Sequence, residues 1–477
     1  MNLSTKVAYN TIVQLISKVV ATALGLIAIA IMTRSLGQAG FGQYTTIITF
    51  LSFFAIIADF GLTLVTVQMI SRPGIEENKV INNLISLRLV SAVLFLGIAP
   101  LIVIFFPYEP IIKLGVAVTA LSFLFILLNQ IFVGLFQRKL RMDKVAIAEV
   151  LGRLVLVAGV CLAIKLNYGL LGIMVATVIG SAINFLFHFI FSLSYVRIKL
   201  EFDLKVWRQI VILAWPIALT IAFNLIYLRA DILILSLIKT QAEVGIYGAA
   251  YKVIDVLVSI PYMFAGVVLP ILTLSWAKKN IEYFNGVMQK SFDLMVILAI
   301  PMILGTQILA KPIMVLVAGD DFAISGVPLR ILILAAGALF FGAMFSHAII
   351  ALGKQKKIIN AYIFTSLTAL AGYLIFIPHF SYVGAAWVTI YSELCIFLAG
   401  LYYVYKFSRF KPNFKVFLKA LFASLIMIGV IYLLPETFYN TGLGLINTLA
   451  IAALVYFFCL YLIKGITKKD ILDLFNK

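Results

Sequence analysis

The stretch FGQYTTIITFLSFFAIIADFGL, residues 41–62, is apolar over almost its whole length and contains one charged residue, Asp59. A helix needs about 20 such residues to cross the roughly 30 Å hydrocarbon core of a bilayer. Similar runs recur along the chain, so the sequence predicts an all-α polytopic membrane protein with about fourteen transmembrane helices. The predicted spans lie near residues 10–33, 43–70, 80–106, 111–136, 145–165, 168–196, 210–238, 244–275, 291–317, 327–352, 358–377, 381–405, 416–434 and 442–463.

The composition of the 477-residue chain agrees with this class, because 64% of the residues are hydrophobic and 12% are charged. Soluble domains have about 45–50% apolar and about 25% charged residues, so a cytosolic enzyme and a disordered chain are excluded. The sequence contains no phosphate-binding loop, catalytic triad or metal-ligand cluster, so we expect no enzymatic activity, no cofactor and no metal site.

The net charge of +18 arises from 37 Lys and Arg residues against 19 Asp and Glu residues. When the loops are numbered alternately, about 25 of these cations fall on one side of the membrane and about six on the other. Positive charge collects on the cytoplasmic side, so we expect both termini to be cytoplasmic. The surplus faces anionic lipid headgroups and does not indicate nucleic-acid binding.

An internal repeat is visible at the start of two spans. Phe41-Gly42-Gln43-Tyr44 opens the second span, and Val244-Gly245-Ile246-Tyr247 opens the eighth. The spacing predicts two six-helix lobes of the same orientation, followed by two C-terminal helices. The predicted N-lobe covers residues 1–196 and the predicted C-lobe covers residues 210–405. An interfacial linker, expected to be helical, joins them over residues 197–209, and residues 406–477 form two further helices and a cytoplasmic tail.

Two longer stretches around these motifs resemble known sequences. The segment Leu36 to Tyr44, followed by Ala58-Asp59-Phe60-Gly61-Leu62, looks like the N-terminal signature of the polysaccharide-transport (Wzx-like) flippases. The segment from Arg229 to Lys252 resembles the second-half signature of the same family. This family belongs to the multidrug/oligosaccharidyl-lipid/polysaccharide exporter superfamily.

The resemblance implies two lobes that alternate between inward and outward access in the inner membrane. The implied substrate is an undecaprenyl-pyrophosphate-linked oligosaccharide, moved from the cytoplasmic to the outer leaflet for O-antigen, capsule or exopolysaccharide synthesis. The implied partners are this lipid-linked substrate, membrane lipids and polysaccharide polymerase machinery.

Cations inside the predicted spans are the candidate substrate-binding residues. Each costs about 2.5–3.5 kcal/mol to insert at a helix centre, so each is expected to face a cavity or a partner. Arginine offers bidentate geometry to phosphate oxygens and lysine offers a point charge, which suits a pyrophosphate. The candidates are Lys18, Arg88, Arg153, Arg229 and Lys252. The alternative is that some extend to headgroups or pair structurally, as Glu149 and Arg153 at i,i+4 could do.

Acidic residues inside the spans are the candidate ion-coupling residues, and they are Asp59, Asp231, Asp255 and Glu393. Asp59 has no cation near it in sequence, so it could couple transport to H⁺ or Na⁺. Two structural alternatives stay open for Asp59, namely pairing with a cation of a neighbouring helix and capping a broken helix.

Two other functions remain open from the sequence. A cation-coupled multidrug exporter of the same superfamily would carry organic cations and would need exposed carboxylates in its passage. A membrane-embedded glycan polymerase would need a long water-exposed catalytic loop, and the loops Gly319–Gly326 and Pro435–Gly442 are too short for that.

Overall fold

The computed structural model describes residues 3–70 and 76–466, and all regular secondary structure in these ranges is helical. The longer helices are α1 (Leu3–Asp59), α3 (Glu77–Ile102), α4 (Pro110–Arg138), α5 (Met142–Lys165), α6 (Gly169–Ser192), α7 (Leu204–Ile238), α8 (Gln241–Ala277), α9 (Ile281–Ala318), α10 (Gly326–Ala351), α11 (Gln355–Ser408), α12 (Lys415–Leu433) and α14 (Gly442–Leu462). Short helices are α2 (Leu62–Ile70), α13 (Glu436–Tyr439) and the 3-10 turns Val103–Phe105 and Asp320–Ser325.

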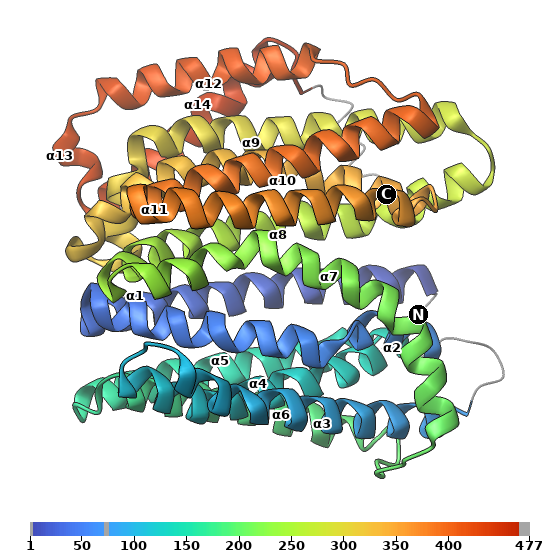
Figure 1. Cartoon of the computed structure of the whole chain (residues 1–477). Helices are drawn as coiled ribbons and strands as arrows, with labels where there is room; N and C mark the ends of the chain where they lie inside the picture. Colours follow the sequence, from blue (N-terminus) through green and yellow to red (C-terminus); the bar gives the residue numbers. More distant parts are fainter. Residues whose placement is uncertain (1–2, 71–75, 467–477) are drawn as a thin grey trace. The chain divides into compact units, whose positions relative to one another are not determined.

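In the described residues, twelve helices are long and apolar enough to cross a membrane. They account for the fourteen predicted spans, because α1 and α11 each contain two spans joined at one non-helical residue. In α1 this residue is Gly37, whose φ of 64° suits glycine, and in α11 it is Ser381. Figure 1 draws the two arms of α1 in dark and lighter blue, running in opposite directions.

The surface of these helices is apolar, as a lipid-facing surface requires. Phe105 is 88% exposed and Leu433 is 85% exposed, and many Leu, Ile and Phe side chains on other helices are more than half exposed. A soluble monomer rarely exposes so much apolar surface to water, whereas a membrane protein exposes such a surface to lipid tails. The chain is therefore a multi-pass membrane protein.

The chain forms two compact units, Met1–Gly248 and Ala249–Lys477, each with its own packing. In the first unit, α1 contacts α3, α4, α5, α6 and α7, and apolar clusters fill the spaces between these helices. In the second unit, α10 packs on α9 and α11, and α12 packs on α9 and α14. The lobe boundaries predicted from the repeat, at 196/197 and 209/210, stay a prediction.

The second predicted span, 43–70, is not one continuous helix. The helix α1 ends at Asp59, and α2 begins at Leu62. Phe60 and Gly61 between them have φ values of 46° and 77°, which interrupt the helical hydrogen-bond ladder. The span was predicted, but the break inside it was not located, because an apolar run indicates burial in the membrane and gives no sign of a local backbone break.

The linker before α7 has no regular secondary structure over residues 197–203, so the helix expected from residue 197 begins only at Leu204. Polar side chains of α3 hold this irregular segment. The Asn82 and Asn83 amides donate to Glu201, and Asn83 Oδ1 accepts from the Asp203 amide at 2.8 Å. The hydrogen bond from Lys79 lowers the pKa of the Asp203 carboxyl, which also caps α7. These side chains satisfy backbone groups that would otherwise form helix.

Several cations of the predicted cytoplasmic side lie outside the described residues, namely Arg72 and the tail residues Lys468, Lys469 and Lys477. The orientation of the termini stays a prediction.

Candidate functional site

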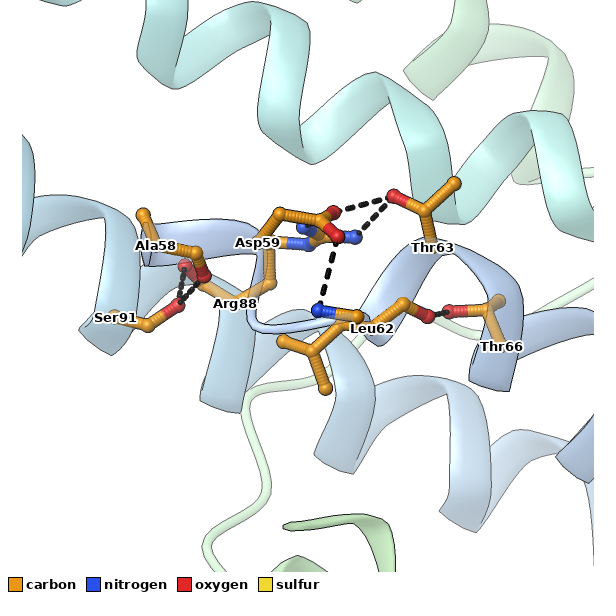
Figure 2. Close-up of polar contacts among 8 residues, drawn as sticks. Ala58, Asp59, Leu62, Thr63, Thr66, Arg88 and Ser91 are labelled. Atoms are coloured by element: carbon orange, nitrogen blue, oxygen red, sulfur yellow. Dashed lines mark hydrogen bonds and ion pairs between the residues drawn. The ribbon is translucent and has the colours of Figure 1, made fainter. Parts of the chain in front are cut away.

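Arg88 and Asp59 form a buried ion pair at the break between α1 and α2. The Arg88 side chain on α3 is 0% exposed, and its Nη1 atom donates to Asp59 Oδ1 (Figure 2). Thr63 on α2 joins the pair, because its hydroxyl accepts from Arg88 Nη2 at 2.9 Å and donates to Asp59 Oδ1. The Gly61 amide donates to Asp59 Oδ2 at 3.1 Å. One carboxylate therefore caps the start of α2 and neutralises a buried guanidinium.

A second contact ties α3 to the same break. The Ser91 hydroxyl donates to the carbonyl oxygen of Ala58, at the end of α1, at 2.9 Å (Figure 2). Both structural alternatives for Asp59 are thus realised in this conformation: it pairs with a cation of a neighbouring helix and it caps a broken one. Its role in ion coupling stays a proposal.

A second charged cluster lies where α1 and α5 pack together. Lys18 Nζ on α1 is 3.9 Å from Glu149 Oε1 on α5, and the Lys18 side chain is 49% exposed. Arg153, one turn further along α5, is exposed, and its guanidinium lies beside Gly25 of α1. Among the described residues, the ion pair of Glu149 is with Lys18 and not with Arg153, the partner considered from the i,i+4 spacing.

The two repeat motifs pack against each other through their glycines. A Cβ atom added to Gly42 of α1 would overlap the carbonyl oxygen of Gln241 in α8, and one added to Gly245 of α8 would overlap that of Gln38. Each glutamine precedes its own glycine by four residues, so the contact is reciprocal. We call this contact the glycine crossing, and it requires glycine because the two backbones touch.

Polar contacts surround the glycine crossing. Thr46 donates to Gln241 Oε1 at 2.8 Å, which joins α1 to α8. The Tyr108 hydroxyl is 2.7 Å from the Ser236 hydroxyl of α7, and burial raises the pKa of Tyr108 to about 12. Tyr108 therefore stays protonated at physiological pH and keeps its hydrogen bond.

The remaining predicted residues fall into three places. Asp231 on α7 is fully buried and accepts from the Tyr247 hydroxyl at 2.8 Å, and Arg229 lies two residues before it, half-buried. Lys252 and Asp255 are half-buried on α8. Glu393 on α11 is 4% exposed, and within the described chain its Oε1 atom has no hydrogen-bond partner.

Sequence reasoning overlooked three features of the site. Thr63 and Tyr247 are neutral, so a search for buried charges does not find them. The glycine crossing did have a sequence signal, since both glycines belong to the repeat motifs, but the repeat does not report that its two copies touch.

Comparisons with known proteins agree with this architecture. Residues 7–276 match the family described as "Polysaccharide biosynthesis protein". The chain is 25% identical over 442 residues to the probable low-salt glycan biosynthesis flippase Agl15 of Haloferax volcanii, with 89% of each chain covered.

Solved structures share the fold. The inward closed conformation of the lipid II flippase MurJ has a TM-score of 0.75 at 19% identity, covering 94% of this chain and 98% of that one. An inward-facing MATE multidrug transporter of the MOP superfamily has a TM-score of 0.66 at 15% identity, covering 84% and 99%. These relatives are flippases and transporters and not enzymes. Because the family match spans more than half of the sequence, the chain belongs to the polysaccharide biosynthesis protein family.

Proposed function

We propose that this protein is a flippase that moves a lipid-linked glycan across the membrane by alternating access. The proposed cargo is an oligosaccharide on undecaprenyl pyrophosphate, carried from the cytoplasmic to the outer leaflet of the inner membrane. The glycan would then enter O-antigen, capsule or exopolysaccharide synthesis. The family membership and the named flippase relatives support this class of cargo.

The observation that carries the proposal is the position of Arg153. It is the twelfth residue of the 24-residue helix α5, so it lies about 17 Å from either end at a rise of about 1.5 Å per residue. An arginine exposed at this depth cannot face lipid tails without a large free-energy cost. We therefore propose that Arg153 faces a hydrated passage, where its guanidinium is available to an anionic group.

The neighbours of Arg153 favour a phosphate over an organic cation. Lys18 and Arg153 together carry two positive charges, and Glu149 neutralises one of them. The remaining positive charge offers a crossing pyrophosphate a replacement for its hydration shell. Lys18 adds a point charge beside the bidentate donor of Arg153.

The other predicted residues are assigned by their surroundings. Arg88 acts as a positioning residue, since its buried guanidinium holds Asp59 and Thr63 at the break of the second span. Arg229 and Lys252 remain proposed substrate contacts in a later stage of transport. Asp59, Asp231, Asp255 and Glu393 remain proposed coupling residues, and the last is a buried carboxyl with an unsatisfied oxygen.

Reconstituted transport tests the proposal directly. Proteoliposomes would contain an undecaprenyl-pyrophosphate oligosaccharide with a fluorescent sugar, and an impermeant quencher would report the fraction in the outer leaflet. We expect Arg153→Gln to slow translocation at least about tenfold, because a charge-assisted hydrogen bond contributes about 1.5–3 kcal/mol. Arg153→Lys should retain part of the rate. The matched control is Lys165→Gln, which removes an exposed charge at the end of the same helix.

Two results would overturn the proposal. One is a folded Arg153→Gln protein that translocates the glycan at the wild-type rate, because this result would show that the charge of Arg153 does not contribute to transport. The other is a wild-type protein that leaves the lipid-linked glycan in place but extrudes a cationic dye. That outcome would favour the multidrug exporter, the rival function that the similarity to MATE folds supports.

A further inference from the structure

A groove of about 290 Å³ lies at the end of α11 that precedes α12. Four side chains at helical spacing form one wall, namely Leu398, Leu401, Tyr402 and Tyr405. The other wall is the returning segment Phe410-Lys411-Pro412, in which Phe410 is 3% exposed. Leu398 and Tyr402 are more than half exposed, so the apolar floor of the groove is open.

The groove is built by an unusual backbone conformation at Arg409. This residue has a φ of 60°, in the left-handed region that non-glycine residues rarely adopt, and its amide caps α11 by donating to the Tyr405 carbonyl. The turn sends Phe410 inward and brings Lys411 back along α11. A strained residue of this kind persists only where the surrounding structure fixes it.

Helix α9 fixes the returning segment. The Gln289 side chain donates to the Asn413 carbonyl at 3.1 Å and accepts from the Asn413 amide at 2.8 Å. Asn285 donates to the Ser408 carbonyl at 3.3 Å. The groove is therefore preorganised by contacts on both sides of Arg409.

Cations surround the groove and are held over its aromatic rings. Arg409 Cζ and Lys411 Nζ lie 5.9 and 5.8 Å from the Tyr405 ring centroid, and Lys406 Nζ lies 5.7 Å from that of Tyr402. Between Glu393 and Glu436 the sequence contains no acidic residue. No carboxylate therefore neighbours these cations in sequence. The carboxylate that packing brings to the returning segment, Asp293 of α9, accepts a hydrogen bond from Gln289 at 2.8 Å.

We propose that this groove is a binding site for an anionic membrane phospholipid. The acyl chain lies along Leu398, Leu401 and Tyr402, and the phosphate sits between Arg409 and Lys411. The end of α11 with these cations is predicted to face the cytoplasm, where anionic headgroups attract basic segments by about 1 kcal/mol per cation. None of the residues that form this groove is among those proposed to bind the transported lipid, and the inference goes beyond the proposed function.

The chain's own C-terminal residues 467–477 are a less suitable occupant. Their side chains include three lysines and two aspartates, which sum to +1, so these side chains offer no net negative charge to the cationic groove. A membrane phospholipid supplies both the negative charge and the apolar tail that the groove complements.

Lipid retention by the purified full-length protein tests this site without any transport assay. Native mass spectrometry would compare binding of phosphatidylglycerol and phosphatidylcholine from mixed micelles. We expect wild-type protein to retain phosphatidylglycerol preferentially and the triple variant Lys406→Gln, Arg409→Asn, Lys411→Gln to lose this preference at least about tenfold. Asparagine at 409 accepts the left-handed conformation, so the turn is kept. The control variant Lys278→Gln, Lys356→Gln, Lys357→Gln removes the same charge from loops on the same predicted side and should behave as wild type.

Three outcomes would overturn the inference. Equal retention of the two lipids by the wild-type protein would show that the groove does not select anionic lipids. An equal loss in the control variant would show that general surface charge is responsible. Displacement of phosphatidylglycerol by equimolar undecaprenyl pyrophosphate would assign the groove to the transported lipid. None of these outcomes depends on whether the protein transports glycans.

Discussion

Arg88 illustrates how the structure changes the meaning of a residue chosen from sequence. The sequence identified both Arg88 and Asp59 as buried charges, one for substrate and one for ion coupling. They are 29 residues apart and on different helices, so sequence spacing could not pair them. The Arg88 side chain is 0% exposed, whereas the Lys18 side chain is 49% exposed and Arg153 is exposed.

We predict that Arg88→Ala destabilises the protein by about 3–5 kcal/mol, because it leaves the Asp59 carboxylate in a largely apolar site without its partner. The double variant Arg88→Gln, Asp59→Asn removes both charges and should recover part of this loss. Thermal unfolding in detergent measures both effects.

A matched control for this experiment is Lys165→Ala, which removes an exposed cation at a helix end and should change stability by less than about 0.5 kcal/mol. If Arg88→Ala unfolds at the wild-type temperature, the ion pair makes no net contribution and the positioning role of Arg88 is wrong.

At the scale of elements, most helix boundaries were predictable from the sequence, whereas the contacts between the helices were not. The predicted spans 111–136 and 442–463 lie within a few residues of α4 and α14. The agreement is expected, because the length of an apolar run determines where a membrane helix begins and ends. Hydrogen bonds from α2 and α3 hold the break at Phe60 and Gly61 and the irregular linker before Leu204. Such bonds join residues far apart in the chain, so no local pattern reports them.

The glycine crossing of α1 and α8 gives a prediction at this scale. Gly42→Val should force the two helices apart, because the new side chain overlaps the Gln241 backbone, which cannot move as a side-chain tip could. In a background with Cys161, Cys395 and Cys459 replaced by alanine, a cysteine at Thr46 should react several-fold faster with an impermeant maleimide.

Gly97→Val is the control, since nothing lies within 4 Å of the Cβ position at Gly97 on α3. Unchanged reactivity of the cysteine at position 46 in the Gly42→Val protein would contradict this prediction, because it would mean that α1 and α8 accommodate the valine without separating.

At the scale of the whole molecule, the sequence was most informative about class and family. The apolar content and the recurring spans predicted the membrane fold, and the two signatures predicted the family. The candidate site was predicted only as a set of charges. Which charges are buried and which are exposed, as for Arg88 against Arg153, follows from tertiary packing.

The distribution of loop charge predicts the orientation of the molecule in the membrane. Single cysteines replacing Lys278 and Lys356 should react with an impermeant maleimide only after cells are permeabilised. Cysteines replacing Lys113 and Asp320 should react in intact cells, because these loops carry few cations. The reverse labelling pattern would contradict the assignment of both termini to the cytoplasm.

The single-residue turns at Gly37 and Ser381 have a consequence for how the protein is made. Each pair of arms is joined at a single non-helical residue, so each pair forms a helical hairpin with almost no connecting loop. In α1 the charged and polar residues at the turn are Arg34, Ser35 and Gln38. We expect the two arms to enter the bilayer as a pair, because these polar residues must cross the hydrocarbon core between them.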